Sequence, residues 1–124
     1  MAYPDDRKYT KDHEWVRLSG DMAEVGITDY AQEQLGDVVY MEFPDVGSRL
    51  TAGQSFGSIE SVKAVSELFA PVGGEVVEVN DAVKDHPEAV NTEPHSSWMI
   101  KVRMSAPSDA EGLLDSAQYQ SLLG

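Results

Sequence analysis

Hydrophobic and polar residues alternate along several segments of the chain, which is the pattern of half-buried β-strands. The clearest case is residues 97–104, where Lys101 and Arg103 fall on one face and the other face carries four apolar side chains, Trp98, Ile100, Val102 and Met104. Similar alternation, or a high content of β-branched and aromatic residues, predicts further strands at residues 14–18, 23–27, 37–43, 54–61, 64–70 and 75–79. The sequence therefore predicts a mainly β protein.

Turn and cap signals divide these strands. Ser19–Asp21 predicts a hairpin between the first two strands, and turns are expected at residues 71–74 and at Asn80–Asp81. Cap and stop signals predict short helices at residues 28–36 (from Thr28 to Gly36), at residues 85–91 (with Pro87 in the first turn and a stop at Asn91), and at the C-terminus, where a Ser108–Glu111 capping box opens a helix toward Leu123. Strands with short flanking helices favour a β-sandwich or flattened barrel with peripheral helices. No linker composition interrupts residues 1–124, so we expect one domain.

The charge of the chain excludes several classes of partner. Nine Lys and Arg residues stand against 22 Asp and Glu residues, for a formal net charge of −13. Binding to nucleic acid or to an anionic membrane needs basic patches, which this sequence lacks. An acidic surface instead suits solubility and attraction to basic protein partners.

Candidate catalytic residues are few. The chain has no cysteine, which excludes disulfides, thiolate catalysis and cysteine-based zinc sites. The three histidines are not spaced as metal ligands, so no metal site is expected. The N-terminus carries no apolar signal core, and we expect a cytoplasmic protein.

One lysine occupies an unusual position. Lys63 lies at the centre of a near-symmetrical segment between Glu60 and Glu67, and the two strands that flank it could pair with each other. Lys63 would then lie at a hairpin tip and project from a rigid support, although the segment has no Asn-Gly or Asp-Gly turn. From the residues alone, an ordinary solvated loop lysine remains the more common explanation.

The segment ESVKAVSELFAPVGGEVVEVN, residues 60–80, resembles the lipoyl-attachment segment of the glycine cleavage system H protein family. Further matches occur in the same order along nearly the whole chain: HEWV from His13 to Val16, VGITDYAQEQLGDVVYMEFPDVG from Val25 to Gly47, Asn91 before a segment that runs from a proline to Trp98, and an LLD…Y tail. The resemblance implies a hammerhead-type lipoyl/biotinyl β-sandwich over residues 1–124. It also implies that Lys63 carries covalent lipoic acid.

The resemblance further implies a carrier rather than an enzyme. Family members take an aminomethyl group from a pyridoxal-phosphate glycine decarboxylase and present it to a tetrahydrofolate-dependent aminomethyltransferase. Dihydrolipoamide dehydrogenase then reoxidises the arm, which a lipoate-attaching enzyme installs. In such proteins the cofactor carries the group and the protein positions it.

Four other residues are candidates by resemblance. Glu14 and Gln34 would lie near a cleft that shelters the loaded arm, although position 34 is often His in the family. Glu60 and Glu67 would help the attaching enzyme or other partners to dock, or would simply be solvated carboxylates on a strand. The segment EPHSSW, residues 93–98, also departs from the commoner family pattern.

Two alternative functions remain at this point. A carrier of the same fold could relay lipoyl or octanoyl groups to other lipoylated proteins, and a glycine decarboxylation assay would separate the two roles. An enzyme that uses Lys63 as a Schiff-base amine would need a desolvated lysine with a lowered pKa, which an exposed hairpin tip does not provide.

Overall fold

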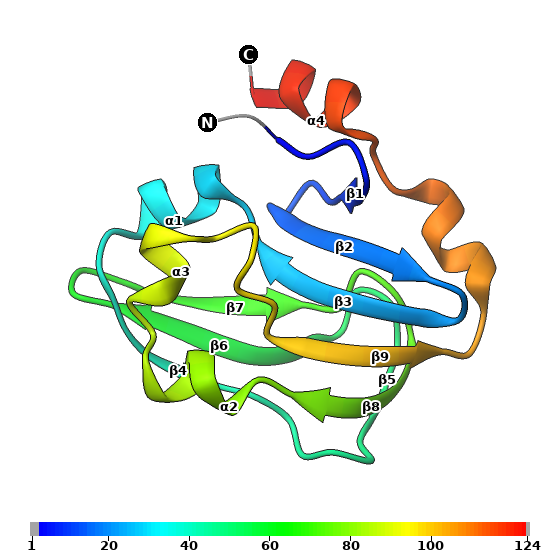
Figure 1. Cartoon of the computed structure of the whole chain (residues 1–124), viewed down its shortest axis with the longest axis horizontal. Coiled ribbons are helices and arrows are strands. Elements are labelled where there is room, and N and C mark those ends of the chain that lie inside the picture. The colour runs from blue at the N-terminus through cyan, green and yellow to red at the C-terminus, as the bar shows by residue number, and fades with distance from the viewer. Residues whose placement is uncertain (1–2, 124) are drawn as a thin grey trace.

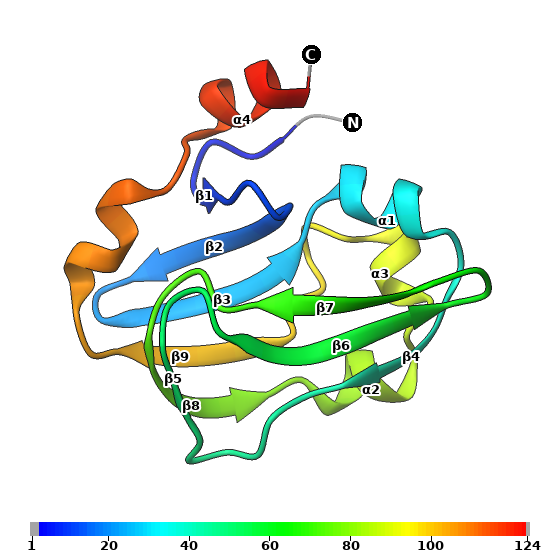
Figure 2. The same cartoon turned by 180° about the vertical axis from the view of Figure 1, so that it is seen from behind.

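Two antiparallel β-sheets packed face to face form the body of the molecule (Figures 1 and 2). The computed structural model describes residues 3–123. The larger sheet has the strand order β1–β2–β3–β9–β8–β5, and the smaller has the order β4–β6–β7. The strands are β1 (Lys8–Tyr9), β2 (Glu14–Ser19), β3 (Met22–Ile27), β4 (Val38–Glu42), β5 (Arg49–Leu50), β6 (Ser55–Ser61), β7 (Val65–Phe69), β8 (Gly74–Val79) and β9 (Ile100–Met104). The predicted β-sandwich is confirmed, with β1 and β5 as short additional strands.

The core lies between the two sheets, and the alternation of the sequence builds it. Along β9, Ile100, Val102 and Met104 are buried, while Lys101 and Arg103 point outward. The larger sheet contributes such apolar side chains to the same cluster as Met41 and Ile59 of the smaller sheet. Full burial of one such side chain contributes roughly 1.5–3 kcal/mol, so this shared layer is what holds the two sheets together.

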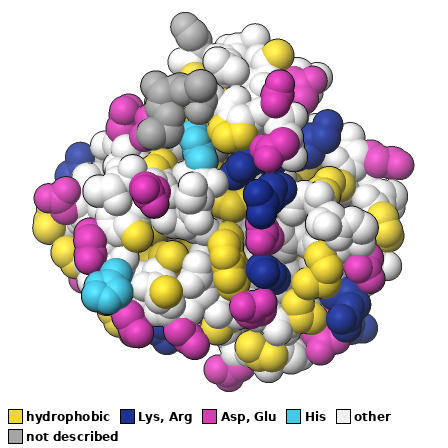
Figure 3. All heavy atoms as spheres, viewed as in Figure 1, with side chains coloured by type: hydrophobic (Ala, Val, Ile, Leu, Met, Phe, Trp, Pro, Cys, Tyr) yellow, Lys and Arg dark blue, Asp and Glu magenta, His cyan; other side chains and the backbone are white. Residues whose placement is uncertain are grey.

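Charged side chains cover the outer face of the larger sheet. Arg17 pairs with Glu24 at 2.7 Å, and Lys101 lies 3.7 Å from Glu24 and 3.5 Å from Glu78. These residues are neighbours across β2, β3, β9 and β8, and Figure 3 shows basic and acidic groups alternating over this face. Exposed pairs of this kind contribute only about 0–1 kcal/mol each, so they keep the face polar more than they stabilise it.

Short helices and one 3₁₀ helix flank the sheets: α1 (Asp29–Leu35), α2 (Asp81–Asp85), α3 (Ala89–Thr92), η1 (Pro107–Gly112) and α4 (Ser116–Leu123). The helix predicted at residues 28–36 is confirmed, because Oγ1 of Thr28 accepts a hydrogen bond from the N–H of Ala31 and Gly36 ends α1. Among residues 3–123, no helix combines the length and the apolar character that crossing a membrane requires.

The predictions around Asn80 and Pro87 need correction. Asn80 does not lie in a simple turn, because its side chain caps α2 by accepting from the N–H of Val83. The backbone leaves the helical conformation at His86, so α3 begins only at Ala89, and Asn91 lies inside it instead of ending it. A short polar segment thus forms two separate helical turns where one helix was expected.

The C-terminal helix is confirmed, but its predicted start at Ser108 is wrong. Residues 107–112 form η1, and the chain then extends because Leu114 pairs with Tyr9 through two backbone hydrogen bonds of 2.7 and 2.9 Å. The capping box that opens α4 is formed instead by Asp115 and Gln118, which exchange hydrogen bonds of 2.8 and 3.0 Å. Pairing with β1 therefore overrides the local signal at Ser108.

Candidate functional site

Lys63 lies in the turn between β6 and β7, which pair in antiparallel register as the sequence predicted. The chain crosses from one strand to the other through Val62, Lys63 and Ala64. The buried hydroxyl of Ser61 accepts hydrogen bonds from the N–H groups of Lys63 at 3.3 Å and Ala64 at 3.1 Å. The side chain of Ser61, at the end of β6, therefore stabilises the turn by hydrogen bonding, which explains how the turn forms without an Asn-Gly pair.

The side chain of Lys63 is exposed, and its stem lies close to the end of α1. A Cβ atom added at Gly36 would lie 3.3 Å from Cε of Lys63, so the lysine stem runs along the backbone that ends α1. Gly36 also has a positive φ of 83°, which favours glycine. Lys63 thus lies exposed in the turn of the predicted hairpin, and the end of α1 provides a platform for its stem.

Asn91 of α3 holds this platform in place. Its side-chain amide donates to the carbonyl oxygen of Gly36 at 2.9 Å and to Oε1 of Gln32 at 3.0 Å. Its Oδ1 atom accepts from the N–H of Val38 at 2.8 Å. Asn91 thus joins the end of α1 to the start of β4 beside the hairpin.

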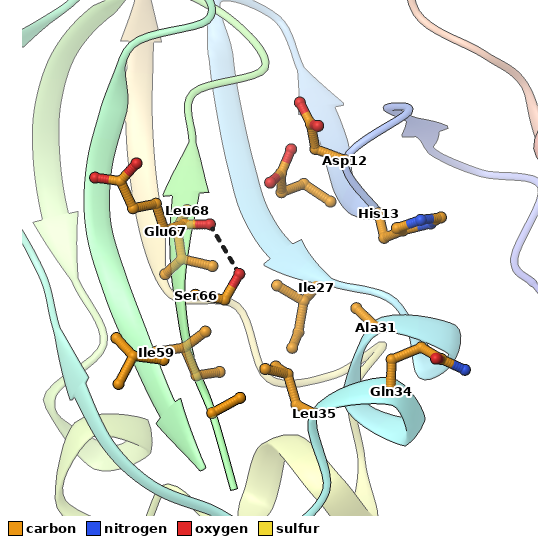
Figure 4. A pocket seen from close by; sticks show the side chains of 13 residues that line it. Asp12, His13, Ile27, Ala31, Gln34, Leu35, Ile59, Ser66, Glu67 and Leu68 are labelled. Atoms are coloured by element: carbon orange, nitrogen blue, oxygen red, sulfur yellow. Dashed lines mark hydrogen bonds between the residues drawn. The ribbon is translucent and has the colours of Figure 1, made fainter.

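A cleft of about 360 Å³ opens beside the hairpin (Figure 4). In Figure 4, Asp12 and His13 lie on one side, α1 lies below them, and the β6–β7 hairpin lies opposite. The cleft is lined by Asp12, His13, Glu14, Ile27, Ala31, Gln34, Leu35, Ile59, Ala64, Val65, Ser66, Glu67 and Leu68. On β7 and the turn before it, the lining starts at Ala64, the residue that follows Lys63.

Glu14 is a buried carboxyl group in this lining, with 2% of its surface exposed. The hydroxyl of Thr10 donates to Oε1 at 2.7 Å, and the N–H of Phe69 donates to Oε2 at 3.3 Å. Burial raises the pKa of Glu14 to about 7, although these two hydrogen bonds act in the opposite direction. The cleft therefore combines apolar walls with one carboxyl group that titrates near neutral pH.

Gln34 and Glu67 also line the cleft, whereas Glu60 does not. Gln34 is exposed and belongs to α1, and Glu67 lies on the edge strand β7. Glu60 is paired with Tyr40 and Val65, and all three are exposed on the outer face of the smaller sheet. Glu14, Gln34 and Glu67 thus all line the cleft, whereas Glu60 lies outside the lining, although it shares the outer face of the smaller sheet with Glu67.

Residues that the sequence analysis did not assign also shape the site. Thr10 fixes the carboxyl group of Glu14, and Tyr119 of α4 contacts both His13 and Thr28 through its hydroxyl, at 2.8 Å in each case. No local sequence signal identifies the contacts of Tyr119, because its partners lie 106 and 91 residues away, whereas Thr10 lies only four residues before Glu14.

The segment at residues 93–98 packs away from the cleft. The carbonyl oxygen of Pro94 accepts from Nε1 of Trp15 at 3.0 Å, and Nε2 of His95 accepts from the N–H of Asp29 at 3.2 Å. The lining of the cleft contains no residue of this segment. The departure from the common family pattern therefore affects the support of β2 and the start of α1, not the cleft wall itself.

Comparisons with known proteins agree on one family. The sequence model described as Glycine cleavage H-protein matches residues 7–124. A glycine cleavage system H protein of Anaeromyxobacter sp. (strain K) is 53% identical over 124 residues, which cover 99% of this chain and 97% of that protein. The corresponding protein of Koribacter versatilis (strain Ellin345) is 55% identical over 120 residues, covering 97% and 93% of the two chains. The crystal structure of a glycine cleavage system H protein from Mycobacterium marinum superposes with a TM-score of 0.91 at 41% identity and covers 98% of this chain and 99% of that one.

Proposed function

The chain belongs to the glycine cleavage H-protein family, the lipoyl carriers of the glycine cleavage system, and on this premise we propose that Lys63 carries the lipoyl group. The observation that carries this proposal is the position of Lys63, exposed in a rigid hairpin turn beside a cleft that contains a buried carboxyl group. Formation of the amide removes the lysine charge and changes the formal net charge from −13 to −14, which is −13 − 1. We propose that residues 1–124 act as one lipoyl-carrier domain in the cytoplasm.

The residues of the cleft fit a lipoyl arm. Ile27, Leu35, Ile59 and Leu68 offer apolar contacts that suit an aliphatic chain. Glu14 offers a carboxyl group inside this apolar lining, which suits a cationic amine at the end of the arm. The cleft adjoins the hairpin turn at Ala64, so an arm on Lys63 can fold back into it.

The lipoyl group supplies the dithiol chemistry that this cysteine-free chain lacks, and it carries an aminomethyl group and electrons between enzymes. We propose that a pyridoxal-phosphate glycine decarboxylase loads the carrier and a tetrahydrofolate-dependent aminomethyltransferase unloads it. Dihydrolipoamide dehydrogenase would then reoxidise it. In this account the chain itself is a carrier and not an enzyme, and its residues bind, orient and shield the arm.

Glu14 has the chemistry to hold the loaded arm. A protonated amine that enters the cleft would favour the ionised form of Glu14 and donate to its carboxylate. A hydrogen bond to a charged group, shielded from water, contributes about 1.5–3 kcal/mol. Gln34, exposed at the edge of the cleft, can accept a further hydrogen bond through its amide oxygen but cannot titrate. Both residues therefore serve as proposed docking contacts for the arm.

The outer face of the smaller sheet is the proposed recognition surface for the lipoate-attaching enzyme. Glu60 lies there in a row with Tyr40 and Val65, of which 49% and 70% of the surface are exposed. Glu67 lies two positions after Val65 on the edge strand β7, and therefore on the same face. Carboxylates beside exposed apolar side chains fit an enzyme surface that combines basic and apolar groups.

Reconstituted glycine cleavage tests the function directly. The lipoylated chain, as the sole carrier, should support release of CO₂ from glycine with the three partner enzymes. Lys63→Arg should abolish this activity, because a guanidinium group cannot form the lipoyl amide. Residual activity of the arginine variant, or inactivity of the lipoylated wild-type chain, would contradict the proposal.

A further inference from the structure

Tyr119 links two walls of the cleft although it belongs to the C-terminal helix α4. Its hydroxyl lies 2.8 Å from Nδ1 of His13, which belongs to the cleft lining and directly precedes Glu14. The same hydroxyl lies 2.8 Å from Oγ1 of Thr28, the N-cap of the helix that carries Gln34. One atom therefore contacts both the segment that presents Glu14 and the start of α1.

The tyrosine ring is held rigidly. Tyr119 is fully buried, and its ring stacks on Tyr9 with centroids 4.9 Å apart and an interplanar angle of 12°. Tyr3 contacts it edge-on with centroids 5.4 Å apart. These contacts fix the hydroxyl in space, so its hydrogen bonds can position their partners.

His13 is a residue that needs such support. Its φ of 68° lies in the left-handed region, which is uncommon for residues other than glycine. Its carbonyl oxygen accepts from the N–H of Thr28 at 3.0 Å, and its ring packs against Tyr30 with centroids 4.6 Å apart. The Tyr119 hydroxyl adds the contact that fixes the imidazole itself.

We propose that Tyr119 is a positioning residue for the cleft, which acts through His13 and Thr28 to hold the Glu14 wall at a fixed separation from α1. The inference rests on the proposed docking of the arm in this cleft. By this proposal, the C-terminal helix helps to shelter the aminomethyl group, although no residue of that helix lines the cleft. Attachment of the lipoyl group to Lys63 does not depend on it.

Tyr119→Phe removes the hydroxyl and keeps the ring, so it isolates this contact. Tyr9→Phe is the matched control, because Tyr9 is equally buried in the same stack but donates to the carbonyl oxygen of Pro4, away from the cleft. We expect Tyr119→Phe to shorten the lifetime of the aminomethyl-loaded carrier several-fold, followed by mass spectrometry, and Tyr9→Phe to leave it unchanged. Both variants should be lipoylated at the wild-type rate.

Two further readouts separate positioning from general destabilisation. In the unlipoylated protein, Tyr119→Phe should change the ¹⁵N chemical shifts of the His13 ring, whereas Tyr9→Phe should not. In a double-mutant cycle with His13→Asn, which tolerates the left-handed backbone but is too short to reach Tyr119, the effects on lifetime should not add. If Tyr119→Phe does not fold, His13→Asn alone should still shorten the lifetime.

Three results would overturn the inference. Equal lifetimes for Tyr119→Phe and wild type, or equal shortening in both tyrosine variants, would remove the positioning role and leave docking of the arm intact. A wild-type lifetime no longer than that of free aminomethyl-lipoamide would instead reject docking itself, and the positioning role with it.

Discussion

The side chain of Lys63 lies against the backbone of Gly36, so that a Cβ atom at position 36 would come within 3.3 Å of Cε of the lysine. The contact joins the hairpin turn to the end of α1. The end of α1 therefore supports the stem of an exposed lysine, and the positive φ of 83° at position 36 accounts for the glycine there.

Gly36→Ala should therefore destabilise the fold and displace the lysine stem. A non-glycine residue in such a backbone conformation costs on the order of 1–3 kcal/mol. Chemical denaturation should show a loss of this size in the free energy of unfolding. Gly112→Ala is the control, because Gly112 has no positive φ and no neighbour within 4 Å of an added Cβ, and it should change stability little. Equal stabilities for the two variants would refute the strain at Gly36.

Asn91→Ala should also destabilise the protein, since it leaves the N–H of Val38 and the carbonyl oxygen of Gly36 without their partner. Loss of a partner from such part-buried groups costs about 1–3 kcal/mol. Gln120→Ala, whose exposed side chain makes one hydrogen bond within α4, provides the control in the same denaturation experiment. A loss at Asn91 no larger than that at Gln120 would show that Asn91 does not support the platform.

The raised pKa of the buried Glu14 predicts that the free energy of unfolding falls as the pH rises toward neutrality. Its pKa is raised from 4.5 to about 7 in the folded state, so the folded protein keeps a proton that the unfolded chain has already released. Stability from this group is complete below pH 4.5 and is lost as the pH rises to about 7, by roughly 3 kcal/mol. Glu14→Gln lacks this titration. Denaturation of both proteins from pH 4 to pH 8 should show the free energy of unfolding of the wild type falling relative to the variant, whereas a constant or rising difference would contradict the burial of Glu14.

Much of this fold could be predicted from local patterns, because each predicted strand alternates or is rich in β-branched residues. The strand at Ile100–Met104 and the β6–β7 hairpin are direct consequences. The short strands β1 and β5 carry too few residues to form a pattern, and Leu114 is extended only because it pairs with Tyr9. Tertiary contact, not local propensity, determines these segments.

Some features of the site could likewise be predicted from the sequence, and others depend on tertiary contacts. The position of Lys63 in a turn followed from its flanking strands, and Glu14 and Gln34 were placed beside a cleft only by resemblance to a family. The buried state of Glu14 could not be predicted, because one of its two hydrogen-bond donors, the N–H of Phe69, lies 55 residues away in sequence, even though the other, Thr10, is only four residues away. The same holds for Tyr119, whose partners lie 106 and 91 residues away in sequence.

Lipoylation should depend on the position of the lysine in the turn and not merely on its neighbours. In the double variant Val62→Lys with Lys63→Val, the lysine moves to the residue whose N–H donates to the carbonyl oxygen of Asp37, and its side chain takes a different direction. The rate of lipoylation by a lipoate ligase should fall sharply. An unchanged rate would show that the attaching enzyme reads sequence alone.

Peptide mass spectrometry after incubation with a lipoate ligase tests the central claim most directly. Wild-type protein should gain one lipoyl group, located on the peptide that contains Lys63, and Lys63→Arg should gain none. The arginine variant should keep its fold, because a change at an exposed turn residue alters stability by only about ±0.5 kcal/mol. A lipoyl group on Lys84 or Lys101, or on the Lys63→Arg variant, would contradict the assignment of Lys63 as the carrier residue.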